Sequence, residues 1–194
     1  MVRRFTILSA LAAVVLVLGL ASCATTARGA GGQGDIVTYL EGHGGTLPSM
    51  MSVQTVVDMA LKSHEASDGS TTSFRWGDLS GKKLYVVSLF PDLGIIKKGK
   101  EITNAELSAF AFAHMDLFSD PRVCLGTWFN KDDGNTYIDI NVVLADKAKA
   151  VELAKRYNQI SIFDLSSFEE TKTGGDGKPI ANLPPPIERL PAFQ

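Results

Sequence analysis

The stretch VCLGTWFNKDDGNTYIDINVVL, residues 123–144, decides the fold of this chain. Two apolar, β-favouring runs, 123–129 and 136–144, flank the polar segment NKDDGN, whose Asp-Gly pair favours a tight reversal. The stretch therefore predicts a β-hairpin. If Trp128 pairs with Tyr137, every other cross-strand pair of the hairpin is fixed, because one pair sets the register of both strands.

This register assigns each side chain of the hairpin to one of two faces, because successive residues of a strand point to opposite sides. One face carries Trp128, Tyr137, Asp139 and Asn141. The other carries Val123, Leu125, Thr127, Ile138, Ile140 and Val142, and we expect this apolar face to meet the helices. On two further predicted strands, Ser88 and Asp164 are expected to share the first face.

The segments around the hairpin predict the order β-α-β-β-α-β. The expected elements are a strand at 84–90, a helix at 103–118, the hairpin, a helix at 147–158 and a strand at 160–165. Thr103 and Glu106 form a capping box at the start of the first helix. This order predicts an α+β, ferredoxin-like domain with a four-stranded antiparallel sheet and both helices on one face.

An additional N-terminal helix is predicted at 53–64, where apolar residues recur at helical spacing along one face. This helix must bury its own apolar stripe. We expect it to do so on the sheet face that the other two helices leave open.

The N-terminus has the pattern of a secretory signal. Arg3 and Arg4 precede an uncharged run, 5–22, that ends in small residues. The order Leu20-Ala21-Ser22-Cys23 resembles the lipobox of bacterial lipoproteins. That resemblance implies cleavage before Cys23 and acylation of Cys23 on its sulfur and its new amine.

A lipid on Cys23 would place the protein on the cell membrane or the outer membrane, with its domain facing the periplasm or the exterior. Two or more acyl chains make such anchoring stable. A plain transmembrane anchor and a soluble secreted protein remain the alternatives. The predicted organisation is a signal peptide at 1–22, a Gly-rich tether at 23–35, one domain at 36–172 and a Gly/Pro-rich tail at 173–194.

Composition and motifs point to few kinds of chemistry. The net charge of −2 gives no electrostatic reason to expect nucleic-acid binding. If Cys23 carries lipid, Cys124 has no disulfide partner and is expected to be a small buried hydrophobe. His114 lies in an apolar helix stripe and lacks an HExxH pattern, and no glycine-rich segment fits a phosphate loop. We therefore expect no metal and no cofactor.

One site hypothesis follows from the predicted faces. A pocket between the 53–64 helix and the polar sheet face would bring together His64, Glu65, Asp139, Asn141 and Asp164, with Trp128 and Tyr137 as apolar walls. A histidine beside a carboxylate can perform general acid–base chemistry. The alternative is that the polar residues are solvated and the aromatic residues only pack against the added helix.

The segment 64–175 resembles small uncharacterised domains encoded by phages and other mobile elements, through its Gly-Thr-Trp, Tyr-x-Asp, Ile-Phe-Asp-Leu and Thr-Gly-Gly motifs. The resemblance implies no activity. The favoured function is binding of an envelope protein or a small ligand. The alternatives are a hydrolase that uses His64 with Asp139 or Asp164, and a phage-type lipoprotein that blocks a receptor.

Overall fold

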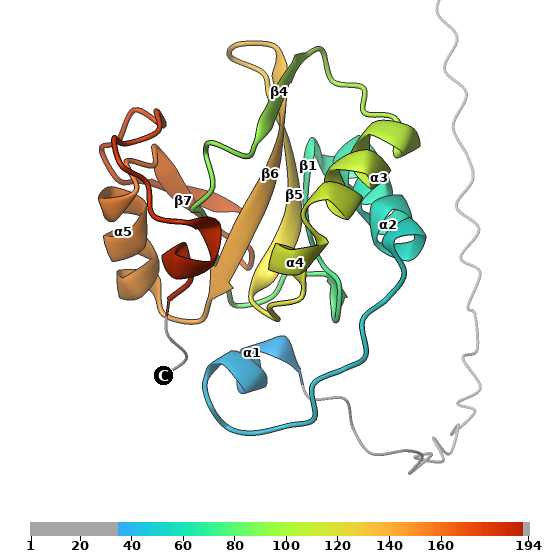
Figure 1. Cartoon of the computed structure of the whole chain (residues 1–194), viewed down its shortest axis with the longest axis vertical. Helices are drawn as coiled ribbons and strands as arrows, with labels where there is room; N and C mark the ends of the chain where they lie inside the picture. Colours follow the sequence, from blue (N-terminus) through green and yellow to red (C-terminus); the bar gives the residue numbers. More distant parts are fainter. Residues whose placement is uncertain (1–34, 192–194) are drawn as a thin grey trace, which may run out of the picture. The chain divides into compact units, whose positions relative to one another are not determined.

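The computed structural model describes residues 35–191 (Figure 1). The lipobox and Cys23 therefore lie outside the described residues. In chain order the elements are α1 (Ile36–Leu40), α2 (Val53–Ser67), β1 (Gly69–Ser73), β2 (Gly77–Asp78), β3 (Tyr85–Ser88), β4 (Ile95–Lys98), α3 (Asn104–Ala113), α4 (Met115–Phe118), β5 (Val123–Asn130), β6 (Asn135–Leu144), α5 (Lys147–Arg156), β7 (Ser161–Asp164), β8 (Glu169–Lys172) and the 3-10 helix η1 (Pro186–Arg189).

Within the described residues, the strands form one eight-stranded antiparallel sheet, so the α+β class is confirmed. The strand order is β2-β1-β5-β6-β3-β7-β8, and β4 pairs with β6 beyond the end of β3. The sheet is therefore larger than the predicted four strands. The hairpin register is confirmed, since Trp128 pairs with Tyr137 and Gly126 pairs with Asp139.

The strands that the sequence patterns did not predict have weak β signals. β1 reads Gly-Ser-Thr-Thr-Ser, a small polar sequence that is typical of loops. It forms a strand because it pairs along the edge of β5, where four of its five residues become buried. Tertiary pairing here overrides local composition.

Three helices contribute to one apolar core on the same face of the sheet. Val57 of α2, Phe110 of α3 and Leu153 of α5 belong to one buried cluster with Ile138 and Ile140 of β6. The apolar face of the hairpin meets the helices as expected. The expected position of the 53–64 helix is wrong, because α2 lies on this helix-covered face and not on the opposite one.

The chain geometry after α2 explains this difference. Asp68 ends the helix in a left-handed conformation, at φ 63°, and the chain turns directly into β1. Because β1 pairs with β5, this short connection holds α2 over the neighbouring strands, and α2 packs against both β1 and α3.

The opposite face of the sheet is covered only at one end. There Ile36 of α1 packs in a second buried cluster with Val86, Cys124 and Val143. Cys124 is a free, fully buried thiol, as predicted, and burial raises the pKa of that thiol far above its ordinary value. A desolvated thiol is a poor nucleophile, so Cys124 has the properties of a structural residue.

The C-terminal segment returns across the helix-covered face between α5 and β6 (dark red in Figure 1). The Arg189 side chain is 3% exposed and forms a bidentate ion pair with Asp92, in which Nη2 donates to Oδ2 at 2.8 Å. Arg189 also donates from Nε to the Pro184 carbonyl at 2.8 Å. The end of the described chain is therefore bound to the domain through a charge pair whose arginine is buried and whose aspartate lies at the surface.

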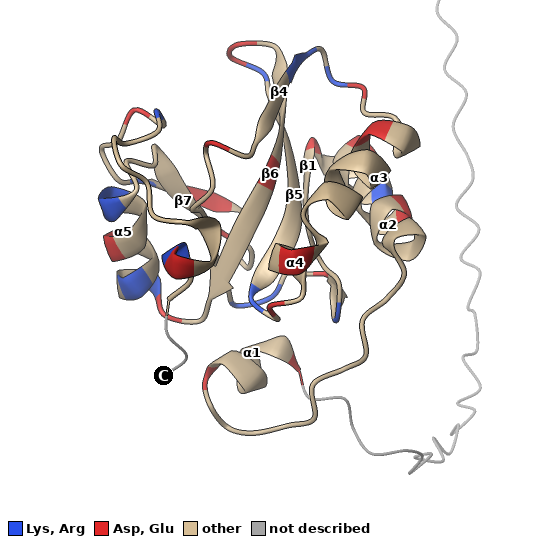
Figure 2. Ribbon diagram, in the orientation of Figure 1, with Lys and Arg blue, Asp and Glu red and all other residues tan. Residues whose placement is uncertain are grey.

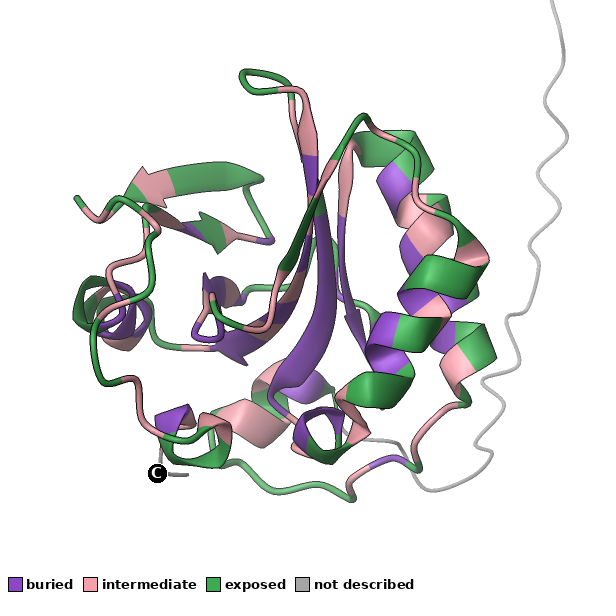
Figure 3. Cartoon of the chain, turned by 45° about the horizontal axis from the view of Figure 1, so that its top comes forward, coloured by how far each residue is buried: buried purple, intermediate pink, exposed green. Residues whose placement is uncertain are grey.

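Charge and burial are distributed unequally over the sheet. Figure 2 shows charged residues mainly on helices and loops, while β5 and β6 are uncharged except for one acidic position in β6. The sequence of β6 identifies that position as Asp139. Figure 3 shows buried positions along the central strands and exposed ones at the loop that joins β5 to β6.

Candidate binding surface on the sheet

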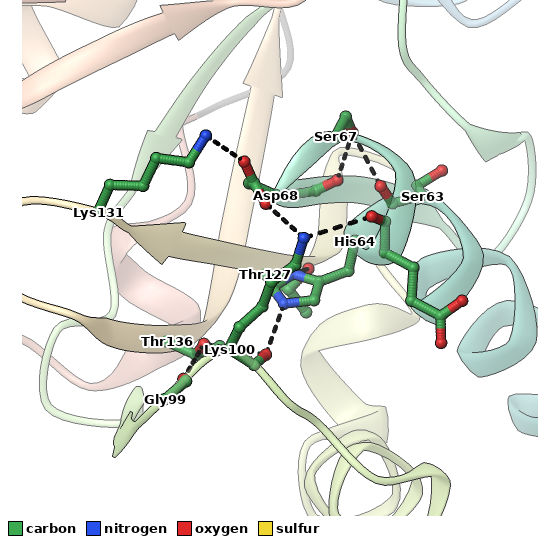
Figure 4. Close-up of polar contacts among 11 residues, drawn as sticks. Ser63, His64, Ser67, Asp68, Gly99, Lys100, Thr127, Lys131 and Thr136 are labelled. Atoms are coloured by element: carbon green, nitrogen blue, oxygen red, sulfur yellow. Dashed lines mark hydrogen bonds and ion pairs between the residues drawn. The ribbon is translucent and has the colours of Figure 1, made fainter.

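The predicted catalytic histidine lies in a buried hydrogen-bond network (Figure 4). His64 Nε2 is 3.0 Å from the carbonyl oxygen of Lys100, and Nδ1 is 3.0 Å from Thr127 Oγ1. Ser70 Oγ is 2.9 Å from the same Thr127 hydroxyl. Because a carbonyl only accepts, Nε2 carries a proton and donates it to the Lys100 carbonyl, and Nδ1 is bonded to the Thr127 hydroxyl.

This network has the properties of a structural element. His64 is 2% exposed, and both of its ring nitrogens have partners. Thr127 and Ser70 are also buried, so neither hydroxyl is open to an external substrate. The network joins α2, β1, β5 and the loop after β4, and it satisfies polar groups that would otherwise be buried at a cost.

The structure does not bring His64 and Asp139 together. Thr127, the partner of His64, pairs directly with Ile138 and lies on the helix-covered face. Asp139 is the next residue of β6 and therefore points to the opposite face. The predicted pocket between the 53–64 helix and Asp139 does not form, because the helix covers the other side of the sheet.

The other acidic candidates are also separate from Asp139. Glu65 is exposed on α2. Asp164 pairs with Tyr85, whose own partner is Leu144, and this register places Asp164 on the helix-covered side. That position corrects the expectation that Asp164 shares the polar face. Its carboxylate accepts from the backbone and the hydroxyl of Ser166 at the β7–β8 turn, which lowers the pKa of Asp164.

A charged cluster lies beside the buried histidine (Figure 4). Lys100 Nζ is 2.5 Å from Asp68 Oδ1, and Lys131 Nζ is 2.6 Å from Asp68 Oδ2. These two lysines lower the pKa of the Asp68 carboxyl to about 2. With two lysines against one carboxylate, the cluster keeps a net positive charge, and it joins the end of α2 to the loops after β4 and β5.

The polar face of the hairpin carries a row of three apolar side chains, which we call the aromatic row after its two aromatic members. The row consists of Ile96 of β4, Tyr137 of β6 and Trp128 of β5, which are consecutive cross-strand neighbours. The ring centroids of Trp128 and Tyr137 are 5.5 Å apart, at 31° between planes. Ile96 is 64% exposed and Trp128 is 50% exposed, so this apolar surface faces outward. Tyr137 donates its hydroxyl to Asp133 Oδ2 at 2.5 Å, which orients its ring.

Two polar side chains lie beside the aromatic row on the same face. Asp139 follows Tyr137 by two positions on β6, and Asn141 follows Asp139 by two more. The Asn141 side chain occupies the space over Gly126, where a Cβ would lie 2.0 Å from its Nδ2. The Asp139 carboxylate occupies the space over Gly94, where a Cβ would lie 2.6 Å from Oδ1. Both glycines are needed to make room for these side chains.

Ser88 extends this polar surface, because it pairs directly with Asn141 across β3 and β6. The expectation that Ser88 shares the face of Asp139 and Asn141 is confirmed. We call the surface formed by the aromatic row with Asp139, Asn141 and Ser88 the open-face site.

Asp139 differs from the other carboxylates near the hairpin in its environment. Within residues 35–191 no hydrogen bond or ion pair joins it to another residue, and desolvation raises the pKa of its carboxyl to about 6. By contrast, Asp133 accepts from Tyr137 and from the Asn135 backbone, which lowers its pKa. An unpaired, desolvated carboxylate is characteristic of a functional site.

Sequence patterns predicted Trp128, Tyr137, Asp139 and Asn141 on one face but missed Ile96 and Gly94. β4 is short and follows Pro91, so only the paired β-branched residues Ile95 and Ile96 carried a strand signal. Gly94 has no recognisable signal in the sequence, because its role depends on the Asp139 side chain of another strand.

A separate apolar hollow of about 430 Å³ lies on the helix-covered side, between α3 and β4. Its lining includes Leu93, Ile95, Phe110, His114 and Ile138. His114 is partly buried here and stacks edge-on against Phe110, with ring centroids 4.9 Å apart. The charged residues of its lining, Lys97 and Glu106, are paired with each other at 2.7 Å.

The described residues contain neither a metal-ligand cluster nor a membrane-spanning helix. No group of three or more His, Cys, Asp or Glu side chains within residues 35–191 is arranged to hold a metal ion. None of the helices in this part of the chain combines the length and apolar character needed to cross a membrane.

Comparisons with known proteins give no relative. No family model matches the chain, and no curated protein or solved structure matches it either. The geometry of the open-face site is therefore the basis on which a function can be proposed.

Proposed function

We propose that this protein is a lipid-anchored lipoprotein of the bacterial cell envelope whose domain is a binding module. The observation that carries the binding role is the aromatic row on an uncovered sheet face. Solvent-exposed aromatic side chains beside buried polar groups are typical of recognition surfaces. The partner is an envelope protein or a small ligand that covers Trp128 and Ile96.

For the fold we propose a ferredoxin-like core of β3, α3, β5, β6, α5 and β7. The order β5-β6-β3-β7 supports it, because α3 joins β3 to β5 across β6, and α5 joins β6 to β7 across β3. The strands β1, β2, β4 and β8 are additions to this core. The addition of β4 matters for function, since it supplies Ile96 to the aromatic row.

Geometry favours binding over hydrolysis. The predicted hydrolase required His64 beside a carboxylate, and the two lie on opposite faces of the sheet. The ring nitrogens of His64 are already bonded to Thr127 and Lys100. The open-face site has a carboxylate but no base–nucleophile pair.

Mass spectrometry of the mature N-terminus tests the anchor. We expect cleavage before Cys23 and the mass of a triacylated cysteine, with the protein in the membrane fraction. The Cys23→Ser substitution should abolish cleavage before residue 23, so that the signal peptide stays attached. A Cys23→Ser variant that is still cleaved after Ser22 and still membrane-bound would refute lipid anchoring.

Capture from intact envelopes tests the binding surface. The full-length protein, cross-linked in place, is compared with Trp128→Ala and with Phe112→Ala. Phe112 is the matched control, because it is a comparably exposed aromatic side chain (66% exposed) on α3. We expect Trp128→Ala to lose the cross-linked partner and Phe112→Ala to keep it. Equal capture by both variants would exclude the open-face site as the binding surface.

A further inference from the structure

We propose that the open-face site binds an organic cation, a guanidinium or ammonium group, held between the aromatic row and the Asp139 carboxylate. This inference rests on the proposed binding function and names the chemistry of the ligand. It requires two features at one place: an unpaired anion and exposed aromatic faces.

The unpaired anion is the first feature. A desolvated carboxylate is costly unless a counter-charge or hydrogen-bond donors compensate it, and the described chain gives Asp139 neither. The positions that flank Asp139 on the same face are Gly126 and Gly94, so neither neighbour supplies a side-chain charge or hydrogen-bond donor to the carboxylate. A cation from outside the chain would supply the missing counter-charge.

The charged groups around Asp139 are few. Tyr137 precedes it on the same face, and its hydroxyl is bonded to Asp133. Lys98 of β4 pairs with Asn135, so it lies beyond the aromatic row, on the far side from Asp139. The helix-covered side presents its cations elsewhere: Lys97 pairs with Glu106, and Lys100 pairs with Asp68.

The aromatic faces are the second feature. A cation within about 6 Å of a Trp or Tyr ring is attracted by the negative face of that ring. Tyr137 and Asp139 are two positions apart on one strand, about 7 Å along its axis. A guanidinium that stacks on the Trp128–Tyr137 pair therefore reaches the Asp139 carboxylate with its edge, where planar N–H donors match carboxylate oxygens.

Asn141 and Ser88 complete the recognition. The Asn141 side chain has both an acceptor and donors, and Ser88 faces it directly across the strands. These neutral groups can bond the remaining polar atoms of a ligand and add no charge that would repel a cation. An anionic ligand is disfavoured, because it would lie against the carboxylate of Asp139.

Fluorescence titration tests the inference in the full-length protein in detergent micelles. The chain has two tryptophans, so a Trp76→Phe background leaves Trp128 as the only emitter. The probes are N-acetyl-arginine amide and its uncharged isostere, N-acetyl-citrulline amide. We expect a saturable change in Trp128 emission with the arginine compound and at least tenfold weaker binding of the citrulline compound.

Two charge-removing variants locate the cation. Asp139→Asn should weaken arginine-amide binding at least tenfold while keeping the near-ultraviolet circular dichroism of a folded domain. Asp132→Asn is the matched control, because it removes one exposed carboxylate from the adjacent β5–β6 loop. It should leave the affinity unchanged. Equal loss in both variants would indicate general surface attraction and would overturn the inference.

Further measurements distinguish a protein partner from a small molecule as the source of the cation. They also distinguish failure of the cation inference from failure of the proposed binding function. An arginine within a short peptide that binds more tightly than the free amide points to a protein partner, whereas equal affinities point to a small molecule. If citrulline amide binds as well as arginine amide, or neither binds, the cation inference is wrong. The proposed binding function would still stand if capture from the envelope depends on Trp128. It would be wrong if capture does not depend on Trp128.

Discussion

Two polar side chains, His64 and Asp139, lie on opposite sides of the same sheet and differ in how their polar atoms are satisfied. Both ring nitrogens of His64 have a partner in the core. Asp139 is desolvated, and no partner is recorded for it among residues 35–191. Both were predicted to belong to a single site.

The difference distinguishes a polar group that stabilises the fold from a polar group that marks a functional surface. A satisfied group stabilises one arrangement of the chain, because removing it leaves its partners unpaired. An unsatisfied charged group lowers stability, and such groups persist where function requires them. His64 therefore supports the fold, and Asp139 marks the surface where a ligand is expected.

The largest expected effect is the loss of a satisfied group. We expect His64→Ala to lower the free energy of unfolding by about 3 kcal/mol, since it leaves a cavity and removes the partners of Thr127 and Lys100. Urea unfolding followed by circular dichroism measures this. Glu65→Ala, an exposed neighbour on α2, is the control and should change stability by less than about 0.5 kcal/mol. Equal effects would contradict a structural role for His64.

The intermediate effect has the opposite sign. We expect Asp139→Asn to raise the free energy of unfolding at pH 7 by about 1–3 kcal/mol, because it removes a carboxylate that is desolvated in the native state. The upper figure is the full value for such a pKa shift, and the lower one allows for solvent screening, because Asp139 is only partly buried.

The pH dependence identifies the carboxyl responsible. The pKa of Asp139 is about 6 in the folded protein and about 3.8 when unperturbed. The native state therefore binds the proton more tightly, and the stability from this group is full below about pH 4 and lost as pH rises to about 6. Urea unfolding at several pH values should show this decline in the parent protein and a smaller one in Asp139→Asn. Identical profiles would refute the raised pKa.

The smallest expected effect concerns an unsatisfied group without charge. Thr72 Oγ1 is buried on the helix-covered face and has no hydrogen-bond partner among residues 35–191. We expect Thr72→Val to raise the free energy of unfolding by about 0.5–1 kcal/mol, because the replacement keeps the shape and removes the unpaired hydroxyl. Thr127→Val is the comparison and should be destabilising, since the Thr127 hydroxyl bonds His64. A loss of stability in Thr72→Val would indicate that Thr72 has a partner.

The hairpin shows how far sequence reasoning reached. The Asp-Gly turn and the alternation along 136–144 predicted the register and therefore the faces of Trp128, Tyr137, Asp139 and Asn141 correctly. These inferences depend on local geometry, in which each residue alternates between two sides. The position of α2 was not predictable in this way, because it depends on β1, a strand whose polar sequence resembles a loop.

By itself the sequence determined the hairpin, the capping box at Thr103, the α+β class and which hairpin residues lie on the open sheet face. These features follow from turn chemistry, helix caps and side-chain alternation, all of which act over a few residues. Only the tertiary structure decided that His64 and Asp139 lie on opposite faces and that Gly94 and Ile96 join Asp139. Those placements arise where β1 and β4 pair with distant strands, and such long-range pairing depends on burial across the whole sheet.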